Sequence, residues 1–543
     1  MSWFAWMMII GYVLLSASLY KVFEKAGEEG WKALVPGLNF VVWSKLVGRP
    51  AWWPVWLLIP IVNVFIYAGL AVDLVRSFGK YGFWDSFLAV VAAPFYFFYL
   101  GMRPEEKYIG PTLPAEKAYA EKLAAAQEKG SKRQYEKLMR ENPYKKGAGR
   151  EWAEAIIFAV FAAALIRLFL IEAYVIPTSS MEGSLMVGDF LFVSKAHYGI
   201  RTPETVAMIP LLHNVVPKIG GESYWEKPSL KAVRLPALEE IERNSPVVFN
   251  LPAGDSVYIF PDRTWTVDDV RYGMVRDANP RYDQLIRSGK KELVTRPMDK
   301  RDHYIKRAIG LPGDTLQIID RQVYLNGKPG ENPTNMQFLH VVNFPSSNIN
   351  ERPFAEWGIS EEDNIRDPNR ASVRYMFLSE EQKEKVQAMD PNIQIEFYEH
   401  STDPSRGYNP DRLFPHDGKN YGPWTVDNYG PIWIPKKGVT VPINRDNINM
   451  FRRIIGVYEG NELEFSNGQI LINGEPDTEY TFKMNYYWMM GDNRHNSEDS
   501  RVWGFVPEDH VVGKPLFIWF SLREGSLAKG VNWSRVFSSA DRR

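Results

Sequence analysis

The chain has 543 residues, with 64 Lys and Arg against 65 Asp and Glu, and it contains no cysteine. This length predicts three or four structural units, and the near-neutral charge balance offers no argument for nucleic-acid binding. The absence of cysteine excludes disulfides, thiolate metal sites and a cysteine nucleophile.

The first third of the chain carries apolar segments near the length of about 20 residues that a membrane-spanning helix needs. The predicted spans are Trp3–Tyr20, Trp52–Val75, Phe83–Leu100 and Ala155–Ile171. A cleaved signal peptide is the competing interpretation of the first span, but its first basic residue, Lys21, follows the apolar run instead of preceding it. We therefore expect a membrane domain of about three spans at 1–101 and a transmembrane anchor at 151–173.

The segment between these two regions, 102–150, is a predicted charged linker. It contains 12 Lys and Arg against 7 Glu, a net charge of 12 − 7 = +5, and Ala115–Arg140 has the composition of a solvated helix. An excess of positive charge beside membrane spans marks the cytoplasmic side. The predicted topology places the N-terminus outside, the linker inside, and everything after the fourth span on the outer, periplasmic face of the cell (inner) membrane.

From Phe190 onward the sequence predicts mainly β-structure, because short Val, Ile, Phe and Tyr runs alternate with Gly, Pro, Asn and Asp clusters. One clear helix is expected at Ser379–Met389, where Ser379 and Gln382 form a capping box and Pro391 stops the helix.

A repeated pattern joins two distant stretches of this β-region. Tyr304–Gly310 and the residues up to Pro329 resemble Met450–Gly456 and the residues up to Pro476. Each copy is predicted to form a strand, a turn and a further strand. Lys306 in the first copy corresponds to Arg452 in the second, and an arginine cannot act as a base because it does not lose its proton in proteins.

The junction between the fourth span and the β-region is dense in hydroxyl groups. Tyr174–Asp189 includes Ser179 and Ser180, and either serine could be a nucleophile from composition alone. None of the eight histidines lies in a His-Glu-x-x-His pattern, and no Gly-x-Ser-x-Gly elbow surrounds Ser180. A lysine whose pKa is lowered by burial remains possible as a base, and Lys306 is the candidate, since strand alternation would turn either Lys306 or Arg307 inward.

Three blocks in this order resemble type I signal peptidases (leader peptidases). They are Ile176-Pro-Thr-Ser-Ser-Met181 with Val187–Phe190, then Tyr304–Asp314, and then Gly491–Arg501 with Trp503–Pro507. The resemblance covers about a seventh of the chain. It implies a mainly β catalytic domain with a signal-peptidase-like fold, following N-terminal α-helical transmembrane segments.

The resemblance also implies a role for each site residue. Ser180 would be the nucleophile and Lys306 the general base, and the Ser180 backbone N–H and the Thr178 hydroxyl would form the oxyanion hole. Ser497 would hydrogen-bond to Lys306 and orient it, Met181 would pack beneath the site, and Asp499 and Arg501 would support the loop. No metal and no cofactor are implied. Thr178 stands where many members have serine.

The implied activity is removal of signal peptides from exported preproteins with small residues at the cleavage site, at the surface of the lipid bilayer and without nucleic acid. The catalytic β-domain is expected at 174–328 and 450–543, interrupted by an inserted cap region at 329–449, because the lysine block and the late block lie unusually far apart. Two alternatives remain open, a Ser/Lys autoprotease and an inactive membrane-tethered β-domain that acts as a scaffold.

Overall fold

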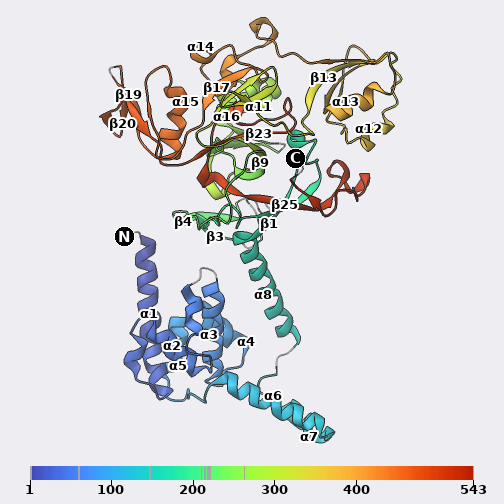
Figure 1. Ribbon diagram of the computed structural model, residues 1–543. Coiled ribbons are helices and arrows are strands. Elements are labelled where there is room, and N and C mark those ends of the chain that lie inside the picture. The colour runs from blue at the N-terminus through green and yellow to red at the C-terminus, as the bar shows by residue number, and fades with distance from the viewer. Residues whose placement is uncertain are drawn as a thin grey trace. The chain divides into compact units, whose positions relative to one another are not determined.

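The computed structural model describes residues 3–58, 62–145, 148–209, 211–212, 214, 216, 222–261, 263–466 and 468–541. Positions 1–2 and 59–61 of the predicted membrane domain, 146–147 of the linker, and 210, 213, 215, 217–221 and 262 of the predicted catalytic region lie outside the described residues. The chain divides into two compact units, Met1–Leu165 and Ile166–Arg543. Figure 1 shows the first as helices and the second as mostly strands.

The first unit is helical. Its apolar core gathers large buried side chains such as Phe23, Trp43 and Phe97, and the Trp43 indole N–H donates a hydrogen bond of 3.0 Å to the Leu70 carbonyl. The helices are α1 Trp3–Lys25, α2 Leu38–Leu46, α3 Val62–Arg76, α4 Phe83–Val91, α5 Ala93–Met102, α6 Thr112–Glu128 and α7 Lys132–Glu141, and α8 Ala148–Phe169 continues past the division between the units.

Helices thus form in each predicted span, but they do not match the predicted spans in length or in apolar character. Among the described residues, no single helix is both long enough and apolar enough to cross a bilayer. In the part of the chain that the structure describes, α4 and α5 alone pass that criterion as a pair, and they are bent by 116° at the break between them. The predicted linker helix is also divided, because α6 ends before Gly130 and α7 begins after it.

The second unit is built on one large sheet, which confirms the predicted mainly β catalytic region. In the described chain this sheet has the strand order β1-β2-β25-β5-β9-β23-β24, and β26 also pairs with β25. The strands are β1 Ile171–Val175, β2 Asp189–Ser194, β5 Pro246–Asn250, β9 His303–Gly310, β23 Tyr486–Met490, β24 Val506–Pro507, β25 Val511–Ser521 and β26 Ser538–Ser539. β9 is central, and it pairs antiparallel with β5 and β23.

Smaller sheets surround this one. The order β12-β11-β10-β17 joins Lys328–Pro329, Gln322–Leu325, Thr315–Ile319 and Tyr429–Trp433, and the order β19-β20-β21 joins Leu463–Ser466, Gln469–Ile472 and Glu475–Pro476. Shorter groups pair β3 Thr205–Met208 with β4 Tyr224–Ser229, β18 Thr440–Pro442 with β22 Glu479–Thr481, and β6 Ser256–Ile259 with β7 Thr264–Thr266 and β8 Val294–Thr295. Short helices complete the unit: α9 Val267–Arg271, α10 Met274–Ala278, α11 Pro280–Arg287, α14 Gly418–Tyr421, α15 Ile448–Arg453 and α16 Ser500–Trp503.

The predicted cap region contains a sheet of its own. Its order is β14-β15-β13-β16, formed by Asn364–Arg366, Val373–Leu378, Phe338–Asn343 and Gln394–Phe397, and α12 Arg352–Glu356 and α13 Glu380–Gln387 accompany it. The predicted capping box is confirmed, since Ser379 caps α13 and exchanges hydrogen bonds with Gln382. Val342, Met376 and Val386 share a buried apolar cluster between this sheet and α13.

The repeat prediction is right for the hairpins and wrong for the leading strand. β10 and β11 in the first copy match β19 and β20 in the second, but Met450–Gly456 is helical and forms the end of α15 and a π-helical turn at Ile454–Tyr458. Ile454 and Ile455 pack in the core beside the second hairpin instead of joining the central sheet. The similar apolar pattern therefore forms a strand in the first copy, at Tyr304–Gly310, and a helix in the second, at Met450–Gly456.

One buried ion pair fixes the loop that precedes β2. The Asp189 carboxylate is fully buried, and the Arg535 guanidinium donates to it at 2.6 Å and to the Ser184 carbonyl at 2.7 Å. Asp189 also accepts from the Met186 backbone N–H and the Ser521 hydroxyl. Arg535, near the C-terminal end of the chain, thereby holds Ser184 and Asp189, which follow Ser180, in place.

Replacing Arg535 with alanine is expected to lower the free energy of unfolding of the second unit by about 3–5 kcal/mol, because Asp189 would stay buried without its charge partner. Denaturant unfolding of the purified full chain, followed by tryptophan fluorescence, measures this loss. Arg523→Ala is the control, since Arg523 is exposed and surface substitutions usually change stability by less than about 0.5 kcal/mol. Equal stabilities of the two variants would contradict the assignment.

Candidate active site

Ser180 lies in a short 3₁₀ turn, Ser179–Met181, between β1 and β2. The chain arrives through the extended Thr178 and leaves through Gly183, whose φ of +93° and close approach to the Asn335 carbonyl leave no room for a side chain. Met181 is buried with Leu185, Leu191 and other apolar residues of the cluster under the turn. The Ser180 side chain is therefore half-buried, and the turn that carries it rests on closely packed apolar side chains.

Lys306 lies in the middle of β9, opposite Val247 of β5. Its Nζ is hydrogen-bonded to the Ser180 Oγ, so the structure brings together the two residues that the sequence singled out. Strand alternation does turn Lys306 and Arg307 to opposite faces, but neither face is open to solvent, because both side chains are buried. β9 is covered on both faces, and Arg307 turns to the opposite face and pairs with Asp492 at 2.7 Å.

Burial lowers the pKa of Lys306 to about 8, since an ammonium loses hydration there. The nearby carboxylates of Asp499, Glu498 and Asp492 oppose this shift and Arg501 reinforces it. A substantial fraction of Lys306 is therefore neutral at mildly alkaline pH and can accept a proton from Ser180.

The late block packs directly against the Ser180 turn. The Asn493 backbone N–H donates a hydrogen bond of 3.2 Å to the Ser180 carbonyl, and the Asn496 side-chain amide donates one of 2.9 Å to the Ser179 hydroxyl. A Cβ on Gly491 would lie 2.4 Å from the Ser180 carbonyl oxygen and 2.3 Å from the Ser497 Oγ. Only a glycine at position 491 thus lets the late block lie this close to the Ser180 carbonyl, a requirement that the sequence motif did not reveal.

The sequence predicted supporting roles for Asp499, Arg501 and Ser497, and these three residues differ in the hydrogen bonds that they form. Asp499 and Arg501 form a buried ion pair at 2.8 Å, and Asp499 also accepts from the Gly491 backbone N–H at 3.1 Å. The Ser497 Oγ lies beside Gly491, but it is buried without a hydrogen-bond partner among the described residues. The hydrogen bond expected from Ser497 to Lys306 is therefore not formed in this structure.

Two groups near Ser180 are available to stabilise an oxyanion. Ser180 is in the first turn of the 3₁₀ helix, where backbone N–H groups lack helical acceptors. The exposed Thr178 hydroxyl has no hydrogen-bond partner among the described residues. Both donors are thus available to a bound group.

The predicted cap region also reaches the Ser180 turn, a connection that no sequence signal indicated. Asp363 accepts a hydrogen bond of 3.1 Å from the Asn493 side-chain amide, and Ser360 donates one of 3.0 Å to Glu182. Glu182 and Asp363 are both buried and share a hydrogen bond, and burial raises the pKa of each carboxyl group. Burial and the neighbouring carboxyl group thus favour the neutral form of Asp363, and the pair joins the cap region to the residue after Met181.

One cluster in the described residues has the composition of a metal site: His400, Asp427 and His495. The His495 Nδ1 accepts a hydrogen bond from the Leu339 backbone N–H at 3.2 Å, and burial lowers the pKa of this imidazole. The neutral ring therefore carries its proton on Nε2, which donates to Asp427 at 2.7 Å. This arrangement fits a hydrogen-bond network better than a metal centre, because Nε2 has no lone pair to offer.

Comparison with known proteins finds matches to two different family models, one in each part of the chain. Residues 149–357 and 477–520 match the family described as signal peptidase, peptidase S26. Residues 31–111 match a family of unknown function, DUF5684. The first match leaves 358–476 uncovered, a range that overlaps the predicted cap region at 329–449 with different bounds.

Bacterial relatives named signal peptidase I align with most of the chain. The Haemophilus influenzae protein is 24% identical over 392 residues, which are 70% of this chain and 74% of that relative. The Helicobacter pylori protein is 22% identical over 399 residues, 72% of this chain and 90% of that relative. The peptidase S26 match and these relatives make the chain similar to the type I signal peptidases over about 70% of its length.

Proposed function

We propose that this protein is a serine endopeptidase that removes N-terminal signal peptides from exported preproteins through a Ser180–Lys306 dyad. The observation that carries the proposal is the hydrogen bond between the Lys306 Nζ and the Ser180 Oγ in a site where the lysine is buried. The Asp427-linked histidines take no part in it, because Ser180 already has its proton acceptor in Lys306.

The first half of the reaction forms an acyl-enzyme. Neutral Lys306 takes the hydroxyl proton as the Ser180 Oγ attacks the scissile carbonyl carbon, and the resulting ammonium returns a proton to the leaving amine as the C–N bond breaks. Lys306 is then neutral again. It accepts a proton from the water that attacks the ester, and it returns that proton to the Ser180 Oγ as the ester bond breaks.

The oxyanion of each tetrahedral intermediate would bind the Ser180 backbone N–H and the Thr178 hydroxyl. The extended backbone at Thr178 and the first-turn position of Ser180 support this assignment. Loss of one such donor typically lowers kcat about 10²–10³-fold.

Asp499, Arg501 and Ser497 would act through position rather than by contact with substrate. The Asp499–Arg501 pair ties the short α16 to Gly491, and Gly491 contacts the Ser180 carbonyl. The Ser497 Oγ lies beside Gly491 without a hydrogen-bond partner among the described residues, so it is free to bond to the Lys306 amine and would orient it once substrate is bound.

We also propose that the N-terminal helices lie in the cell membrane as a multi-pass anchor, with the catalytic unit on the outer side and in contact with lipid. The bent pair α4–α5 has the length and composition of a span. Large apolar side chains are exposed on these helices and on α8, including Trp84, Phe95 and Phe158. Such exposure is unusual in water and stabilising in lipid.

Ser180→Ala is expected to lower preprotein cleavage by about 10⁴–10⁶-fold, the cost of removing a serine nucleophile, without changing the unfolding midpoint. Detergent-solubilised full chain and a preprotein with a small-residue cleavage site provide the assay. Ser179→Ala is the matched control, because Ser179 only accepts a hydrogen bond from Asn496. Cleavage by the Ser180 variant at the wild-type rate would end the proposal.

The kcat/KM for the preprotein should rise with pH around a midpoint near 8, because protonated Lys306 cannot act as a base. Glu498→Gln should move the midpoint to lower pH, since the Glu498 carboxylate raises the pKa of Lys306. Glu464→Gln, at an exposed position, serves as the control. A profile that stays flat through this range, or an upward shift in the Glu498 variant, would assign the base elsewhere.

The topology can be tested cleanly because the natural chain has no cysteine. A membrane-impermeant maleimide applied to intact cells should label a Leu527→Cys variant, since Leu527 is exposed on the catalytic unit. It should not label a Lys129→Cys variant until the membrane is permeabilised. Labelling of Lys129→Cys in intact cells would reverse the proposed orientation.

A further inference from the structure

The strand β16 leaves one edge of the cap-region sheet open. It is the last strand in the order β14-β15-β13-β16, and β13 is its only partner strand among the residues that the structure describes. The Tyr398 N–H donates to the Leu339 carbonyl, and Val341 lies opposite Glu396 in the same register. Because hydrogen-bonding direction alternates along an antiparallel strand, the backbone groups of Ile395 and Phe397 point away from β13.

Hollows border this edge on both faces of the sheet. A groove of about 910 Å³ extends from β16 over Val341, Tyr398 and His400. A second hollow of about 410 Å³ lies over His340 and beside α13, and Ile395 and Phe397 line both hollows. Successive side chains of an extended peptide point to opposite faces. A strand added to β16 would therefore find space for both sets of side chains.

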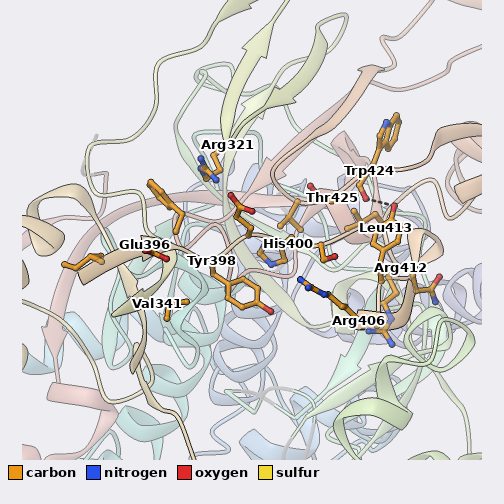
Figure 2. Close-up of a pocket in the computed structure, with 18 residues that line it drawn as sticks. Arg321, Val341, Glu396, Tyr398, His400, Arg406, Arg412, Leu413, Trp424 and Thr425 are labelled. Atoms are coloured by element: carbon orange, nitrogen blue, oxygen red, sulfur yellow. Dashed lines mark hydrogen bonds between the residues drawn. The ribbon is translucent and has the colours of Figure 1, made fainter. Parts of the chain in front are cut away.

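The wall across the larger groove offers one free cation and aromatic surface. In Figure 2, Glu396 and Tyr398 lie on one side of His400, and Arg406, Arg412 and Trp424 lie on the other. Arg412 pairs with Asp277, whereas the exposed Arg406 forms no ion pair among the described residues. The carboxylates of Glu396 and Glu399 also line this groove, so it suits a peptide with mainly apolar side chains and a polar group that can reach Arg406.

This edge is continuous with the active site through a short chain of contacts. Gln337, just before β13, forms a bridge with Asn493, whose N–H donates to the Ser180 carbonyl. Leu339 accepts from Tyr398 beside β16 and donates to His495 of the late block. Neighbouring strands lie about 4.8 Å apart, and three such steps (β16 to β13, Gln337 to Asn493, and Asn493 to the Ser180 turn) separate the open edge from Ser180, about 14 Å in all.

We propose that the open edge of β16 binds an extended segment of the preprotein downstream of the cleavage site by β-strand addition. Backbone hydrogen bonds to Ile395 and Phe397 would supply affinity, and the two hollows and Arg406 would select side chains. This inference rests on the proposed function and adds a second substrate contact away from Ser180.

Two substrates separate this contact from the active site: a preprotein with a long mature segment, and a peptide that ends a few residues past the same cleavage site. Ile395→Pro removes an outward N–H, which an edge strand tolerates, and Arg406→Glu reverses the free charge. Each variant should raise KM for the long substrate about two- to tenfold, the effect of losing one hydrogen bond, with kcat unchanged. KM for the short peptide should not change.

The opposite edge of the same sheet provides matched controls. Arg366 lies on β14, where it is exposed and its N–H also points outward, because Ile365 pairs with Tyr375 in the hydrogen-bonded register. Arg366→Pro and Arg366→Glu should leave both KM values unchanged. Ile395→Val, which keeps the N–H and trims the side chain, separates loss of the donor from loss of packing and should cleave the long substrate like wild type.

Hydrogen exchange gives a readout that does not depend on these substitutions. In the full-length Ser180→Ala protein, the long substrate should slow exchange of the Ile395 and Phe397 amides, and the short peptide should not. Equal KM changes for both substrates, or no protection of these amides, would overturn the groove inference while leaving the dyad intact. If wild-type protein cleaves neither substrate, the proposed function fails and this inference fails with it.

Discussion

The burial of the Lys306 amine is the constraint on which the rest of the catalytic unit depends. An amine exposed to water keeps its proton to about pH 10, whereas this one lies in the middle of a central strand and its pKa falls to about 8. A strand covered on both faces can exclude water from Lys306 only if the surrounding segments close over it. The Ser180 turn, the late block and β5 provide that closure.

Buried charge pairs set the positions of those segments. Asp189 with Arg535, Asp492 with Arg307, and Asp499 with Arg501 each join parts of the chain around the Ser180 turn or the Lys306 strand. Such pairs gain little net stability over apolar packing, but loss of one partner is costly. Here the ion pairs restrict the loops to a single arrangement, and in that arrangement Gly491 contacts the Ser180 carbonyl.

The cap region is connected to this arrangement rather than appended to the surface. It reaches the Ser180 turn through the buried Glu182–Asp363 pair and the bridge between Gln337 and Asn493. The same sheet ends in an open strand with hollows on both faces. A region that both supports the nucleophile loop and offers a free strand edge is suited to couple recognition of a long substrate with its cleavage.

Local patterns in the sequence determined the mainly β character of the second unit and the capped helix α13, because alternation and capping act between neighbouring residues. Resemblance selected Ser180 and Lys306 as the dyad. Only the tertiary structure decided that Met450–Gly456 is helical, that Arg307 is buried beside Lys306, that Ser497 lacks the expected hydrogen bond, and that Asp363 reaches the site. These features depend on tertiary contacts, and those of Arg307 and Asp363 join residues more than a hundred positions apart. A pattern of nearby residues carries no information about which distant surface will cover it.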